Sequence, residues 1–323
     1  MKTNAIVRIV LFSLAIFFLL GVLGVGLGVT TYMVSFTEET GKTVVSSPGE
    51  VTVIPAPAVT ETSACTADPA RICEIEIEWA AGSITIEPSD SSTEILIRES
   101  EVAEKYRMEC RQSGETLSIR YSKDSIAFPS FGASIPAKDL VITVPAGWIC
   151  ESLEIDAASA NVIVCDMTIR KLDYNGASGA CQLHRCVVDL LDLDTASGNV
   201  TFTGCLDSLD FDGASADCAL VLSNCPSHID LDGMSGSLDI TLPSDCGFTV
   251  YTEGLSSDFS SDFATTLRSG AHCYGDGTCR MEIDALSGKV CVRDGGYAAH
   301  SSAEDCPDTS ACSIHSSHHS GHH

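Results

Sequence analysis

A repeat of about 19 residues constrains the fold of this chain more than any other feature of its sequence. Its clearest copy, residues 191–202, reads Leu-Asp-Leu-Asp-Thr-Ala-Ser-Gly-Asn-Val-Thr-Phe. The serine of this unit recurs at Ser159, Ser178, Ser197, Ser215, Ser235 and Ser287, and the first five are 19, 19, 18 and 20 residues apart. A unit this short cannot bury an apolar face alone, so it must stack on its neighbours.

Apolar residues occupy four fixed positions of the unit, six and four before the serine and three and five after it. In one copy they are Leu191, Leu193, Val200 and Phe202, and all six copies keep the four positions apolar. Alternation at period two on both sides of a small-residue corner predicts strand, turn and strand. We therefore expect an all-β fold, a β-solenoid of coils of about 19 residues stacked about 4.8 Å apart.

The segment before the repeat predicts a membrane anchor. Ile9 to Val29 is a run of 21 uncharged residues, which as a helix spans about 32 Å. Lys2 and Arg8 precede it, which predicts a cytoplasmic N-terminus, a single pass through the cell membrane and an extracellular remainder. A cleaved signal peptide is the alternative. The predicted regions are an N-terminal transmembrane helix (1–33), a stalk or linker (34–71), a β-solenoid domain (72–293) and a disordered Ser/His-rich tail (294–323).

The charge of the chain is strongly acidic, with 18 basic and 44 acidic residues and a net charge of −26. This excludes nucleic acid as a partner, since phosphate binding needs clustered Lys and Arg. Much of the charge lies in two columns, five and three residues before the serine, where eleven of twelve residues in the six copies are carboxylates. Both columns face outward, because they alternate with the apolar positions.

Stacking places these like charges about 4.8 Å apart, which costs about 0.9 kcal/mol per neighbouring pair even at the dielectric constant of water. Bridging calcium ions, a polycationic partner or partial protonation would each relieve the repulsion, and a simple solvated face is the alternative. The candidate metal ligands are Asp192, Asp194, Asp210, Asp212, Asp230 and Asp232.

The 16 cysteines predict disulfides in an exported protein. Cys186 and Cys205 both lie eight residues after a repeat serine, so adjacent coils would bring them within bridging distance. Cys273 and Cys279 are spaced to close a small loop. No Cys-x-x-Cys pair is present, which argues against a structural zinc site.

The sequence offers little support for an enzymatic function. A serine repeated at every coil corner is expected to be structural, with its hydroxyl bonded to the backbone or the next coil. Coils of 18–20 residues leave no long loops to build a cleft, and only residues 124–137 and 264–280 are candidates for one. The sequence therefore assigns no catalytic residue.

Several segments together resemble one bacterial family. They are Leu-Val-Ile-Thr-Val-Pro (140–145), the Ala-Ser-Gly coils, Ile-Thr-Leu-Pro (240–243) and Ile-Asp-Ala-Leu-Ser-Gly-Lys-Val (283–290). In this order they look like the putative-adhesin family of β-strand-repeat surface proteins. The resemblance covers about residues 72–293, implies a right-handed β-solenoid in the cell envelope, and carries over no catalytic residues.

These observations predict a non-enzymatic, membrane-anchored extracellular module for interaction or adhesion. Its partner would be a surface ligand or protein that the sequence does not identify, and its only cofactor would be calcium on the acidic face. A ligand-sensing component of an envelope-stress or regulatory system is the alternative, followed by a carbohydrate-active enzyme.

Overall fold

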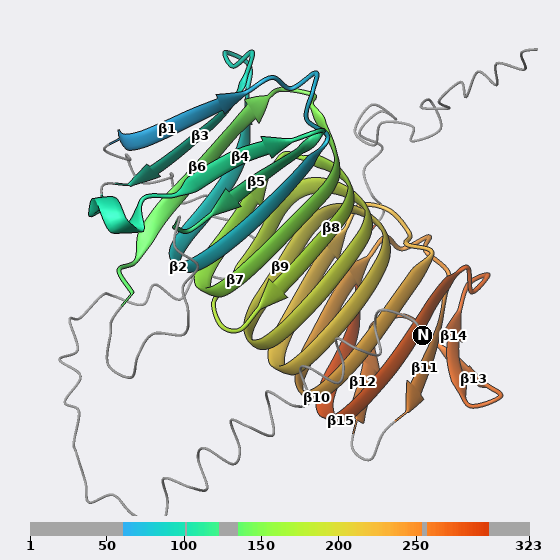
Figure 1. The fold of residues 1–323 in the computed structure, drawn as a ribbon. Coiled ribbons are helices and arrows are strands. Elements are labelled where there is room, and N and C mark those ends of the chain that lie inside the picture. Colours follow the sequence, from blue (N-terminus) through green and yellow to red (C-terminus); the bar gives the residue numbers. More distant parts are fainter. Residues whose placement is uncertain (1–60, 101, 123–134, 254–256, 297–323) are drawn as a thin grey trace, which may run out of the picture. The chain divides into compact units, whose positions relative to one another are not determined.

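The computed structural model describes residues 61–100, 102–122, 135–253 and 257–296, which all belong to one compact unit (Figure 1). Their backbone forms a single 15-stranded sheet, wound into coils, and one short 3₁₀ turn, η1 (Glu104–Tyr106). The predicted all-β solenoid is therefore confirmed for this part of the chain.

The middle of the solenoid is a stack of parallel strands in the predicted register. It contains β7 (Ile149–Cys165), β8 (Thr168–Gly176), β9 (Cys181–Leu222) and β10 (His228–Leu242). Leu153 pairs with Leu172, Leu172 with Leu191, and Leu209 with Ile229. All four apolar positions of all six repeats are buried, so each coil covers the apolar side of the next.

The coil corners explain the small residues of the repeat. Gly198 has a φ of 134°, and a Cβ atom there would lie 2.0 Å from the carbonyl oxygen of Gly179 in the preceding coil. Only glycine fits this approach. The hydroxyls of Ser178 and Ser197 donate to the carbonyl oxygens of Ala158 and Ala177 in the preceding coil, which is the structural role predicted for the repeat serines.

The coils at both ends do not follow chain order. β2 (Glu74–Ser89) pairs with β7 on one side, and on the other side with β5 (Thr116–Arg120) and β6 (Lys138–Pro145), which come later in the chain. At the other end, β15 (Cys279–Asp294) lies between β10 and the earlier strands β11 (Phe248–Glu253) and β12 (Ser257–Ser261).

Antiparallel strands cover both ends of the parallel stack. At one end these are β1 (Glu61–Ala67), β3 (Ile95–Ser100) and β4 (Glu109–Ser113), and at the other β13 (Thr266–Arg268) and β14 (Ala271–Tyr274). β3, β4 and β14 pair with the outer strands β6, β5 and β11, and β1 and β13 pair with β3 and β14. They therefore protect edges that would otherwise pair with another chain.

Two predicted boundaries need correction. Residues 61–67 were assigned to the stalk, but they form β1, which pairs with β3 and belongs to the folded domain. Residues 264–280, one of the two candidate long loops, contain the β13–β14 hairpin.

The predicted transmembrane segment at residues 9–29 and the tail from residue 297 onward lie outside the described residues. In the part that is described, no helix has the length and apolar character needed to cross a membrane.

Candidate functional site: an acidic ladder on the solenoid

The outward columns of the repeat form a continuous acidic surface, which we call the acidic ladder. On each coil two polar residues flank a buried apolar residue of the same strand, so both lie on the outer face. One column contains Glu76, Glu154, Asp173, Asp192, Asp210, Asp230 and Glu282, and the other contains Glu78, Asp156, Asn175, Asp194, Asp212, Asp232 and Asp284.

Strand register confirms that these residues are stacked neighbours. Asp173 pairs with Asp192, and Asp230 pairs with Asp210 on one side and Glu282 on the other. In the second column Asp232 pairs with Asp212 and Asp284. The six predicted metal ligands therefore lie on one face, two on each of three consecutive coils.

Basic and amide groups meet the ladder on both sides of its middle residues, Asp192 and Asp210. Lys171 Nζ lies 3.1 Å from Asp173 Oδ2, and Asn175 donates from Nδ2 to Asp173 Oδ1 at 3.1 Å. Toward the other end, Arg280 donates from Nε to Glu282 Oε1 at 2.7 Å.

The middle of the ladder resists ionisation. Burial, followed by the neighbouring Asp173 and Asp210 carboxylates, raises the pKa of Asp192 to about 6. Burial, followed by the charge of Asp212, raises the pKa of Asp194 to about 7. These two carboxyls are thus partly protonated near neutral pH, which is one of the predicted ways of relieving the repulsion.

One part of the ladder gathers ligands of two chemical types. The donor atoms of His228, Asp230 and Glu282 all lie within 4.8 Å of one another. Among the described residues this is the one set of three His, Cys, Asp or Glu side chains that meets this spacing. Asp230 was among the predicted ligands, whereas His228 and Glu282 were not. The other five predicted ligands are stacked without forming such a set.

The cysteine predictions fail for a geometric reason. Cys186 is a free, buried thiol, so it is not bridged to Cys205. A Cβ atom added to Gly204 would lie 2.0 Å from the carbonyl oxygen of Cys186, so Gly204, 18 residues along the chain, is its neighbour in the next coil. The 18-residue coil shifts the register by one at this turn.

Cys273 and Cys279 are also free thiols. Cys273 of β14 pairs with Thr249, whereas Cys279 of β15 pairs with Phe248, on the opposite side of β11. One strand therefore separates them, at a spacing of about 9.6 Å, too far for a disulfide.

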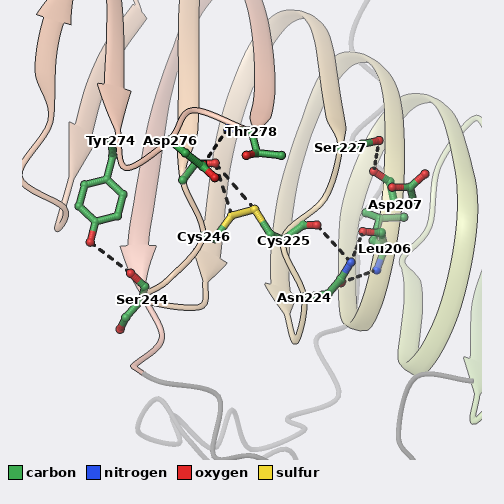
Figure 2. The surroundings of a disulfide bond; sticks show 11 residues. Leu206, Asp207, Asn224, Cys225, Ser227, Ser244, Cys246, Tyr274, Asp276 and Thr278 are labelled. Atoms are coloured by element: carbon green, nitrogen blue, oxygen red, sulfur yellow. Dashed lines mark hydrogen bonds between the residues drawn. A yellow bond between two sulfur atoms is a disulfide. The ribbon is translucent and has the colours of Figure 1, made fainter. Parts of the chain in front are cut away.

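Two disulfides that the sequence did not predict join pairs of described residues. Cys65 is bonded to Cys110, which joins β1 to β4, and Cys225 is bonded to Cys246 at a coil turn (Figure 2). Beside the second bond, the side chain of Asn224 donates to the carbonyl oxygen of Leu206 and accepts from its N–H, both at 2.9 Å. These turns are therefore held by side-chain and covalent links between successive coils.

A small cavity lies near the corner of the last repeats, lined by residues that include Phe211, Leu231 and Gly236. Its volume is about 20 Å³, which is room for a single water molecule. It does not offer the space that a small-molecule substrate needs.

Comparison with known proteins gives a family match and distant likenesses to solved structures. The family model described as Toastrack DUF4097 matches residues 72–221 and 153–293, which together span more than half of the chain. Among curated proteins, no sequence matches this chain.

Three of the matching solved structures each cover 72% of this chain. One, a putative cell adhesion protein from Clostridium sporogenes, has 9% identity, 98% of its own chain covered and a TM-score of 0.33. A putative adhesin from Bacteroides fragilis has 13% identity, 96% of its chain covered and a TM-score of 0.38. Another from Parabacteroides distasonis has 13% identity, 96% covered and a TM-score of 0.37.

Proposed function

Starting from the fact that this chain belongs to the Toastrack DUF4097 family, we propose that it is a non-enzymatic surface module that binds a cationic partner through the acidic ladder. In this proposal the segment from Ile9 to Val29 anchors the chain in the cell membrane, and the solenoid lies outside it as a module for interaction or adhesion.

The acidic ladder is the single observation that carries this proposal. Like charges stacked on neighbouring strands are normally avoided, because they destabilise a sheet. Here the stacking extends through consecutive coils, from Glu76 to Glu282, with carboxylates in both columns. A partner with several positive charges would offset the repulsion between the stacked carboxylates. Its charges could pair with carboxylates on successive coils.

The surroundings of the ladder favour binding over catalysis. The described coils are filled by buried apolar side chains, and the ladder residues of the same strands are half-buried or exposed. A hydrolase or lyase that uses paired carboxylates needs a cleft to hold its substrate and exclude water. The 20 Å³ cavity at the coil corner is far below that size.

The test compares two variants that remove the same number of charges from the full-length chain. In the first, Asp192, Asp194, Asp210 and Asp212 are changed to Asn. In the second, four exposed carboxylates away from the ladder are neutralised by Asp90→Asn, Glu94→Gln, Glu104→Gln and Asp245→Asn. The probe is an oligolysine peptide, and its binding to the immobilised, detergent-purified chain is measured at about 0.15 M and about 1 M salt.

We expect the unmodified chain and the second variant to bind the probe at the lower salt concentration, and the first variant to lose most of the binding. Equal binding by the two variants would mean that only net charge matters and would overturn the proposed role of the ladder. Membrane anchoring is tested separately by alkaline extraction of membranes and by protease treatment of intact cells. Release of a shortened chain would contradict the anchor.

A further inference from the structure

The strands β10 and β15 bring a histidine and two carboxylates together at one place on the acidic ladder. His228 and Asp230 are two residues apart on β10, so their side chains lie on the same face. Asp230 pairs directly with Glu282 of β15, and the donor atoms of the three side chains lie within 4.8 Å of one another. A single bound ion is therefore within reach of all three residues after small side-chain rotations.

The chemistry of these donors differs from that of the rest of the ladder. Carboxylates alone favour calcium and magnesium, whereas an imidazole nitrogen is a good ligand for zinc, nickel, copper and iron. In the column that contains His228, the neighbouring coils have Ser208 on one side and Arg280 on the other. Of these three paired positions, only that of His228 places an imidazole beside the acidic residues.

Arg280 pairs in register with His228, and its guanidinium contacts Tyr251 and one oxygen of Glu282. Its guanidinium lies 4.4 Å from the ring centre of Tyr251, which belongs to β11 on the side of β15 opposite to β10. It donates from Nε and Nη2 to Oε1 of Glu282. Both hydrogen bonds go to Oε1, so the second carboxylate oxygen of Glu282, Oε2, takes no part in them.

We infer that His228, Asp230 and Glu282 form a binding site for a divalent transition-metal ion such as zinc. The bound ion links β10 to β15, and this is the junction where the chain order of the coils is interrupted. The segment between these strands contains β11 to β14, which complete the end of the solenoid. A metal ion here would fasten the inserted strand to the coil before it. This inference goes beyond the proposed function and does not depend on a cationic partner.

The experiment uses the full-length chain with His315, His318, His319, His322 and His323 changed to Ala, because tail histidines also bind such ions. Zinc stoichiometry is measured by competition with a chromophoric chelator, and thermal unfolding is followed with and without zinc. Cobalt absorption separates the site from cysteine thiolates, because thiolate ligands give intense charge-transfer bands and nitrogen and oxygen ligands do not.

We expect the parent to bind one equivalent of zinc that is lost in His228→Gln and in Glu282→Gln. His272→Gln on β14 and Asp192→Asn in the middle of the ladder are the matched controls. Both are expected to bind one equivalent of zinc. Arg280→Gln binds zinc at least as tightly as the parent, since it frees both oxygens of Glu282. Zinc raises the unfolding temperature of the parent and of both controls.

Equal zinc stoichiometry in the parent and His228→Gln would overturn the inference. Displacement of zinc by an equal concentration of calcium would overturn it too, because that would mean that carboxylates alone hold the ion. Circular dichroism of each variant confirms that it is folded, and retained binding in the Arg280→Gln variant separates loss of a ligand from general damage at the junction. Loss of oligolysine binding has no bearing on these outcomes.

Discussion

Lys138 and Glu99 form an ion pair in which both side chains are completely buried. The ammonium group also donates to the carbonyl oxygens of Tyr106, at 2.7 Å, and Tyr121, at 2.6 Å. It lies 4.4 Å from the ring centre of Trp79 and 4.3 Å from that of Tyr121. Burial lowers the pKa of Lys138, and the hydrogen bond to Glu99 opposes that effect. The pair therefore fastens β3, η1 and the end of β5 to β6.

Breaking this pair is expected to destabilise the domain strongly. Lys138→Met leaves the Glu99 carboxylate buried without its cation, which costs about 3–5 kcal/mol of unfolding free energy in urea titration. The control is Lys171→Met, whose partner Asp173 is partly exposed, and it should cost less than about 1 kcal/mol. The double variant Lys138→Met with Glu99→Leu should lose less than the sum of the single changes. Additive losses would show that the two residues act independently.

The coil corners are expected to tolerate no side chain where successive coils touch. Gly198→Ala combines a positive φ with a Cβ atom 2.0 Å from the oxygen of Gly179, so we expect a loss of about 3 kcal/mol or more. Gly114→Ala is the control, because its φ of 63° is also positive but nothing lies within 4 Å of the new atom. It should cost about 1–2 kcal/mol, from backbone strain alone. Equal losses in urea titration would mean that the contact between coils is unimportant.

The raised pKa values of Asp192 and Asp194 predict that the fold becomes more stable as the pH is lowered. Their folded values are about 6 and about 7, well above the unfolded value of about 3.9. The folded state therefore binds protons more tightly, and stability is gained as the pH falls from about 8 toward 4.

Differential scanning calorimetry across this range is the measurement for that prediction. The variant Asp192→Asn with Asp194→Asn should unfold a few degrees higher than the unmodified chain at pH 8 and should gain less on acidification, since about 1 kcal/mol corresponds to about 2–4 °C in a domain of this size. Asp90→Asn with Glu94→Gln is the matched control. A pH profile identical in both variants would contradict the assignment to the ladder.

Calcium is expected to stabilise the ladder through its carboxylates. Millimolar calcium should raise the unfolding temperature of the unmodified chain, because carboxylate oxygens are its preferred ligands. Changing Asp192, Asp194, Asp210 and Asp212 to Asn should abolish that rise, while zinc stabilisation through His228 should persist. No calcium shift in the unmodified chain would leave protonation or a cationic partner as the source of relief.

The sequence by itself determined which residues lie inside the coils and which form the ladder. Alternation at period two places Leu191 and Leu193 inward and Asp192 and Asp194 outward, and the 18–20-residue spacing aligns these positions from coil to coil. The alternation and the repeat spacing are both visible in the sequence, so they can be interpreted without the folded structure.

Tertiary structure alone decided which strands become neighbours where the repeat is irregular. Periodicity reports the face of a strand but not the identity of the strand beside it, which depends on long-range packing at the ends of the stack. This is why the insertion of β15 between β10 and β11, the Asp230–Glu282 pairing and the Lys138–Glu99 pair could not be read in advance. For the same reason one missing residue at a turn placed Gly204, rather than Cys205, beside Cys186.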